Sequence, residues 1–199
     1  MLATGIKNKI ELIAGFGKVK PGKKVEVTNE KGGTTELSAD HIIIATGARS
    51  RELPNLPQDG KKIIGYRKAM TLDKKPDSMV VVGSGAIGSE FAHFYNSIGT
   101  QVTLVEFMEN IVPLEDEEVS KQLGRSFKKA GINVMTKSEV LSVDTSGEKC
   151  KVLIKTKKGE ETIEADIVLS AVGNAPNNEG NGLGKNRRVN ARRKGFVYR

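Results

Sequence analysis

The chain has 199 residues, of which 37% are hydrophobic and 28% are charged, a composition typical of one or two folded domains. It has no run of about 18 apolar residues, which excludes a membrane-spanning helix, and its first residues lack the apolar core of a signal peptide. A single cysteine, Cys150, and two histidines exclude a disulfide framework, a dithiol redox centre within this chain and a Cys- or His-rich metal site.

The net charge of +8 comes from one end of the sequence. Seven of the 32 basic residues lie between residues 181 and 199, a stretch without an acidic residue, and the other 25 nearly balance the 24 acidic residues. Aromatic residues enter this stretch only at Phe196 and Tyr198, so the pattern favours a disordered, solvated tail over a nucleic-acid site. We therefore treat residues 179–199 as an atypical basic tail and predict neither nucleic acid nor membrane as a partner.

Residues 1–55 are predicted to be rich in β-structure. Strand-like segments cover residues 9–19, 23–29 and 36–48, with turn-forming residues between them. The run HIIIATG, residues 41–47, is apolar and β-branched, as in a strand buried on both faces. Residues 52–62 contain two prolines and a glycine and are predicted to be a linker at a domain boundary.

After Pro76 the pattern alternates between strands and helices. A short apolar strand at residues 78–83 precedes an amphipathic helix at 86–99, a second strand at 100–107, a helix at 113–131 and a third strand at 132–138. The second helix has Asp116, Glu117 and Glu118 in its first turn, Lys128 and Lys129 in its last turn, and Gly131 to end it. Strand–helix–strand repeats predict a parallel sheet with right-handed crossovers. Residues 139–173 contain further strands joined by turns.

The stretch VVVGSGAIGSEFAHFYNSIGTQVTLVEF, residues 80–107, contains Gly83, Gly85 and Gly88 at the turn between the first strand and its helix. In a nucleotide site the first glycine makes the turn, the second lets the backbone approach a pyrophosphate, and the third lets helix and strand pack closely. Glu106 follows Gly83 by 23 residues and ends the second strand, where a carboxylate can accept both ribose hydroxyls. A turn without a ligand is the alternative, but the surrounding strand, helix and acid favour a dinucleotide site.

Glu106 also bears on which nucleotide is bound. A carboxylate repels a 2′-phosphate, and residues 107–112, FMENIV, include no basic side chain to bind one. We therefore predict NAD rather than NADP. The predicted fold is α/β: a Rossmann-like parallel sheet with helices on both faces plus a β-meander, at residues 60–178.

The segments IIIATGARSRELP, VVVGSGAIGSEFA, VTLVEF and ADIVLSAVGNAPN resemble, in this order, the middle of dihydrolipoamide dehydrogenases. These are the FAD-dependent E3 components of 2-oxo-acid dehydrogenase complexes and belong to the pyridine nucleotide-disulfide oxidoreductases. The resemblance covers residues 4–179, and it implies that residues 1–55 are a partial FAD-binding domain.

The resemblance also implies roles for individual residues. NAD would be held by Gly83, Ser84, Gly85, Ala86, Ile87, Gly88, Ser89 and Glu90, with Glu90 near the nicotinamide. Glu106 would bind the adenosine ribose, Val140 would touch the adenine, and Gly173 would lie beside the nicotinamide. FAD would be approached by Gly17, Thr46, Gly47 and Ala48.

The sequence also departs from the family pattern. It has no first GxGxxG for FAD, no CxxxxC disulfide, no GD motif for FAD and no dimerisation domain with a catalytic His-Glu pair. We therefore expect no catalytic residue in this chain and no dithiol oxidation by the chain alone. The family implies lipoylated subunits and a homodimer partner for the parent enzyme, in the cytoplasm or the mitochondrial matrix. Two alternatives are another NAD(P)H-dependent flavin disulfide or peroxide reductase, and a non-catalytic nucleotide-binding fragment.

Overall fold

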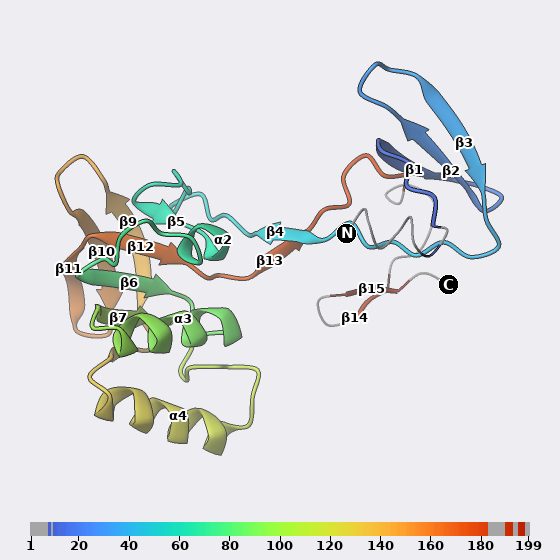
Figure 1. Ribbon diagram of the computed structural model, residues 1–199. Helices are drawn as coiled ribbons and strands as arrows, with labels where there is room; N and C mark the ends of the chain where they lie inside the picture. Colours follow the sequence, from blue (N-terminus) through green and yellow to red (C-terminus); the bar gives the residue numbers. More distant parts are fainter. Residues whose placement is uncertain (1–7, 9, 183–189, 193–194, 198–199) are drawn as a thin grey trace. The chain divides into compact units, whose positions relative to one another are not determined.

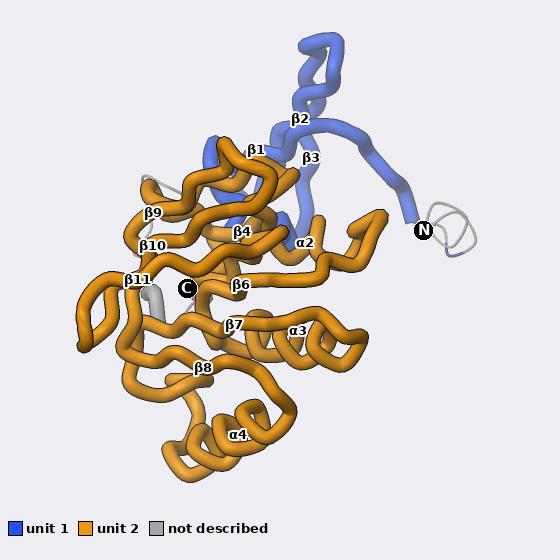
Figure 2. The backbone as a smooth tube through the Cα atoms, turned by 90° about the vertical axis from the view of Figure 1, so that its left-hand side faces the viewer, with its two compact units in different colours: residues 1–48, 176–199 blue, residues 49–175 orange. Residues whose placement is uncertain are grey.

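The computed structural model describes residues 8, 10–182, 190–192 and 195–197 and divides the chain into two compact units (Figures 1 and 2). Unit 1 comprises residues 1–48 and 176–199, and unit 2 comprises residues 49–175. The predicted domain limits of 55, 60 and 178 stay predictions. No helix in the described part of the chain is both long enough and apolar enough to span a membrane.

Unit 2 is built on a five-stranded parallel sheet with the strand order β5-β12-β6-β7-β8. Its strands are β5 (Ile63–Ile64), β12 (Ile167–Ser170), β6 (Ser78–Val82), β7 (Gln101–Val105) and β8 (Asn133–Met135). From β6 the chain moves outward through β7 and β8, and it later returns to the other side of β6 as β12. The boundary between β6 and β12 is therefore the point where the strand order reverses, the usual position of a ligand in such sheets.

All three described helices of unit 2 pack against one face of this sheet. They are α2 (Tyr66–Ala69), α3 (Ala86–Ser97) and α4 (Glu117–Lys129). Side chains alternate along β6, so Met79 and Val81 join the helices in one core while Val80 and Val82 face the other side. Asp116, predicted in the first turn, instead caps α4 by accepting a hydrogen bond from the Glu118 N–H. Gly131 follows the helix with φ +91°, as predicted.

The second face of the sheet is covered by a β-meander of β9 (Glu139–Asp144), β10 (Cys150–Thr156) and β11 (Gly159–Ala165). Val152, Ile154 and the fully buried Cys150 pack there against the sheet. The α/β fold is confirmed, but the expectation of helices on both faces is wrong. The apolar positions of the meander supply the cover that helices provide in a doubly wound sheet.

Unit 1 contains a three-stranded antiparallel sheet of β1 (Phe16–Lys20), β2 (Lys24–Thr28) and β3 (Thr34–Ser38). The predicted buried strand at residues 41–47 is wrong: these residues form no strand, and Ile43 is 91% exposed. A strand buried on both faces needs sheet neighbours, and the described residues supply none to this segment. The chain passes between the units through β4 (Ala48–Ser50) and β13 (Asn174–Pro176), which pair with each other.

The basic tail is only partly described. Its strands β14 (Asn190–Arg192) and β15 (Gly195–Val197) pair in antiparallel fashion, so the expectation of a disordered tail is wrong for these residues. Residues 183–189, 193–194 and 198–199 lie outside the described residues.

Candidate nucleotide-binding site

The turn from β6 into α3 requires glycine at two positions because of close backbone packing. Gly83 has φ +94°, and a Cβ there would meet the Ala171 carbonyl oxygen at 2.7 Å. A Cβ on Gly88 would lie 1.9 Å from the Gly83 carbonyl oxygen and 3.2 Å from the Ala171 Cβ. Both glycines therefore let helix, turn and strand approach one another, as the sequence predicted for the motif.

Gly85 differs from the other two glycines because its neighbourhood is open. It is the exposed N-cap of α3, with φ −62°, and a Cβ there would have no atom within 4 Å. No side chain caps this helix, and its first turn contains no acidic residue. The first N–H groups of α3 are thus left for a ligand, and the open space at Gly85 fits the approach of a pyrophosphate.

Glu106 follows β7 and connects this strand to the glycine turn. Its Oε2 atom accepts hydrogen bonds from the Ser84 N–H at 2.8 Å and the Ser84 hydroxyl at 2.6 Å, while its Oε1 atom accepts one from the Met108 N–H at 2.8 Å. The residue is 6% exposed. Because a carboxylate can accept about four hydrogen bonds, these three fix its position and leave capacity for another donor.

The loop between β7 and α4 is tied to the same turn through Val112. Its N–H donates to the Ser84 carbonyl at 2.9 Å, and its own carbonyl accepts from the Glu115 N–H at 2.9 Å. Val112 has φ +41°, which is unusual for a β-branched residue and indicates backbone strain held by its surroundings. No local pattern indicates this role, because valine is not a residue that predicts a left-handed turn.

The end of β12 closes the opposite side of the turn. The Ala171 N–H donates to the Val82 carbonyl at 2.8 Å, and Gly173 follows with φ +109° on the surface. The structure therefore brings the glycine turn, Glu106 and the segment before Gly173 to the carboxyl ends of β6, β7 and β12. Ala171 was missed in the sequence, although a small residue after a buried strand could have indicated it.

The other predicted NAD residues occupy varied environments. On α3, Ala86 and Glu90 are exposed, Ile87 is half-buried and Ser89 is buried, with its hydroxyl bonded to the Ser84 carbonyl at 2.9 Å. The Val140 side chain, on β9 of the meander, packs in the core between the meander and the parallel sheet. Its carbonyl accepts a hydrogen bond from the Asn55 side chain at 2.7 Å. Contact of Val140 with adenine stays a prediction.

The predicted FAD residues lie in unit 1. Gly17 is an exposed residue of β1, whereas Thr46 and Gly47 directly precede β4, where Ala48 is half-buried. The carbonyls of Thr46 and Gly47 accept hydrogen bonds from Asn177, at 3.2 Å from its side chain and 3.0 Å from its N–H. Gly47 has φ +72°, a conformation that glycine adopts without strain.

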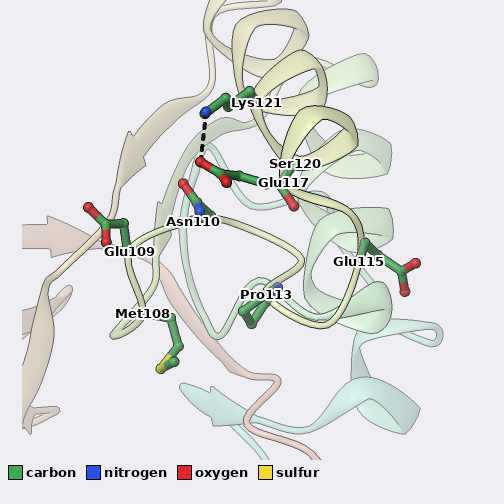
Figure 3. Close-up of a pocket in the computed structure, with 8 residues that line it drawn as sticks. All are labelled: Met108, Glu109, Asn110, Pro113, Glu115, Glu117, Ser120 and Lys121. Carbon is green, nitrogen blue, oxygen red and sulfur yellow. Dashed lines mark ion pairs between the residues drawn. The ribbon is translucent and has the colours of Figure 1, made fainter.

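A cavity of about 520 Å³ lies beside the loop that follows Glu106 (Figure 3). It is lined by Met108, Glu109, Asn110, Pro113, Glu115, Glu117, Ser120 and Lys121. Glu117 and Lys121 form an ion pair of 2.7 Å across one turn of α4. None of the predicted NAD residues lines this cavity, so it is separate from the open backbone at Gly85.

Comparison with known proteins identifies the family. The model of the pyridine nucleotide-disulphide oxidoreductases matches residues 2–197. A dihydrolipoyl dehydrogenase of Zymomonas mobilis is 40% identical over 92% of this chain and 41% of its own length. A leghemoglobin reductase of Vigna unguiculata is also 40% identical, over 90% of this chain and 35% of its own length.

The crystal structure of LpdA from Mycobacterium tuberculosis has the same fold, with a TM-score of 0.82 and 31% identity over 94% of this chain and 42% of that protein. The chain thus spans well under half the length of these relatives. The resemblance inferred from the glycine turn, the ATGA segment and the AVGNAP segment is confirmed. The chain belongs to the pyridine nucleotide-disulphide oxidoreductase family.

Proposed function

We propose that unit 2 binds NAD as part of a flavoprotein of the dihydrolipoyl dehydrogenase type. The observation that carries this proposal is the contrast within the glycine turn, where Gly83 and Gly88 are closely packed while Gly85 faces open space at a helix N-terminus. This arrangement exposes backbone N–H groups and a partial positive charge to a pyrophosphate. When bound, NAD would accept a hydride from a reduced flavin.

Glu106 supports binding of the adenosine ribose. Its carboxylate is fixed by Ser84 and Met108 before any ligand arrives, so little side-chain entropy is lost when it accepts ribose hydroxyls. The buried negative charge at this point disfavours a 2′-phosphate, which supports NAD over NADP. Val140, Gly173 and Glu90 are proposed, from the family resemblance, to contact the adenine and the nicotinamide half.

For FAD we propose backbone contacts from Gly17 and from the segment Thr46, Gly47 and Ala48. The exposure of Gly17, Thr46 and Gly47 is compatible with such contacts. Lipoylated subunits of 2-oxo-acid dehydrogenase complexes are the proposed partners of the parent enzyme. A reductase of the same family with a different electron partner is the second candidate, because the leghemoglobin reductase is as similar as the dihydrolipoyl dehydrogenase.

This 199-residue polypeptide is not expected to oxidise dihydrolipoamide by itself. A redox disulfide needs two cysteines, and Cys150 is the only one in the sequence and is fully buried. Lipoamide-dependent production of NADH by the purified chain, followed by absorbance, would overturn this expectation.

The direct test is a calorimetric titration of the purified chain with NADH, with NADPH and FAD as parallel ligands. We expect NADH to bind, NADPH to bind much more weakly, and Gly85→Ala to weaken NADH binding while the circular dichroism spectrum is retained. A folded chain that binds no NADH would contradict the proposed function.

A further inference from the structure

Lys137, in the loop after β8, is bonded to the segment that follows β7, although residues 107–112 themselves include no basic side chain. The Lys137 N–H donates to the Met108 carbonyl at 2.9 Å, and the Met108 N–H in turn binds Glu106 Oε1 at 2.8 Å. The next residue, Ser138, donates its N–H to the Glu106 carbonyl at 3.0 Å. The loop after β8 is thus bonded through its backbone to the acid that is proposed to hold the ribose, and Lys137 belongs to this loop.

The charge of Lys137 is neutralised by Glu109. The Lys137 Nζ and the Glu109 carboxylate form an ion pair, and the Glu109 side chain is 69% exposed. The hydrogen bond and charge of Lys137, together with the charge of Lys157 between β10 and β11, lower the pKa of Glu109. Figure 3 shows Glu109 apart from the Glu117–Lys121 pair, so these are two separate ion pairs.

On the basis of the proposed NAD site, we propose that Glu109 is a specificity-determining residue that favours NADH over NADPH. Glu109 holds the Lys137 ammonium in an ion pair. Without this ion pair, Lys137 would be available to bind a 2′-phosphate. Lysine has a flexible four-carbon stem, so a Lys137 side chain released from Glu109 can turn toward a phosphate at the Glu106 end of β7. Discrimination then has two components: repulsion by Glu106 and sequestration of Lys137 by Glu109.

The two components predict a measurable effect of one exposed substitution. Glu109→Gln removes the negative charge and keeps the size of the side chain. It should lower the ratio of the Kd for NADPH to the Kd for NADH about five- to tenfold, the gain expected for a cation a few ångströms from a single phosphate charge in water. The gain should shrink at high ionic strength, because salt screens exposed charges. The fold should persist, because an exposed ion pair contributes little to stability.

The experiment compares four forms of the full chain by calorimetry with NADH and NADPH. Glu115→Gln is the matched control, because Glu115 is exposed in the same loop and also lines the cavity beside it. We expect the Kd ratio to fall in Glu109→Gln, to stay unchanged in Glu115→Gln, and to return to its original value in Glu109→Gln combined with Lys137→Met.

Three results would overturn the inference: an unchanged ratio in Glu109→Gln, an equal fall in Glu115→Gln, or a fall that persists in the double variant. Each of these is observed with NADH still bound, so the proposed function survives. Failure of the unsubstituted chain to bind NADH would instead overturn the proposed function, and this inference with it.

Discussion

The two ends of β6 carry the same hydrogen-bonding arrangement with different surroundings. At the start of the strand, Asp166 Oδ2 accepts from the Ser78 N–H at 2.8 Å and from its hydroxyl at 3.0 Å. Beyond its end, Glu106 Oε2 accepts from the Ser84 N–H at 2.8 Å and from its hydroxyl at 2.6 Å. In each case a carboxylate from a neighbouring segment binds both donors of one serine.

The surroundings decide what each carboxylate can do. The Asp166 carboxylate lies 3.6 Å from the Lys149 ammonium, and the Asp166 N–H donates a further hydrogen bond to the Ser78 hydroxyl at 3.0 Å. It therefore joins the starts of β6 and β12. Glu106 lies at the carboxyl edge beside an uncapped helix, where a ligand can approach. The same pattern therefore joins neighbouring segments at both edges of the sheet, and only at the carboxyl edge does it lie beside an uncapped helix N-terminus.

The largest expected effect lies in the glycine turn at the carboxyl end. Gly88→Ala places a Cβ 1.9 Å from a backbone oxygen, and such overpacking should cost about 1–3 kcal/mol of unfolding free energy and abolish NADH binding. The Cβ added by Gly85→Ala has no atom of the chain within 4 Å, so the urea midpoint should stay nearly unchanged. The same Cβ would lie in the space proposed for the pyrophosphate, so NADH binding should weaken. Equal destabilisation of the two variants in urea unfolding would contradict this assignment.

A second prediction separates the two carboxylates. Glu106→Gln should weaken NADH binding about tenfold or more and also lower stability, because a charge-assisted hydrogen bond is worth about 1.5–3 kcal/mol. Asp166→Asn should lower stability by a similar amount and leave NADH binding unchanged. Parallel calorimetry and urea unfolding measure both quantities. A loss of NADH affinity in Asp166→Asn would show that the two ends are coupled.

The smallest expected effect is the acid sensitivity of the Asp166 end. Burial raises the pKa of Asp166, but the hydrogen bonds from Ser78 and the charge of Lys149 outweigh it and hold the pKa below the ordinary value of 3.8. A carboxyl with a lowered folded pKa contributes stability that is complete above its unfolded pKa and is lost as the pH falls through the folded pKa. Between about pH 5 and about pH 3, the free energy of unfolding measured in urea should therefore fall more for the unsubstituted chain than for Asp166→Asn. An equal fall in the two proteins would refute this role of Asp166.

The sequence predicted the parts of the site that depend on local pattern. The three glycines, the amphipathic α3 and the acid after β7 each have a signal within a few residues, and the structure has the turn and the strands where the pattern indicates them. The split of residues 159–170 into β11 and β12 had no such signal. Both parts are strand-like, and only the packing of the meander on the sheet separates them.

The errors and omissions have a common physical origin in long-range contacts. Residues 41–47 have the composition of a buried strand, but burial depends on neighbours that local composition does not contain. The bond from Val112 to Ser84 and the approach of Lys137 to Met108 join segments that are more than 25 residues apart. Residues 107–112 include no basic side chain, and the segment after β8 brings Lys137 to them from a distant part of the sequence.

The pairing of β4 with β13 has a consequence for how this chain could have arisen and how it can be divided. Unit 2 is one uninterrupted stretch of sequence, and the strands at which it begins and ends are hydrogen-bonding neighbours. A segment whose entry and exit points adjoin can be inserted into a host chain, or exchanged between hosts, without displacing the ends that receive it. Unit 2 thus has the architecture of a segment that can be transferred as a whole, with its two ends held together by the β4–β13 pair.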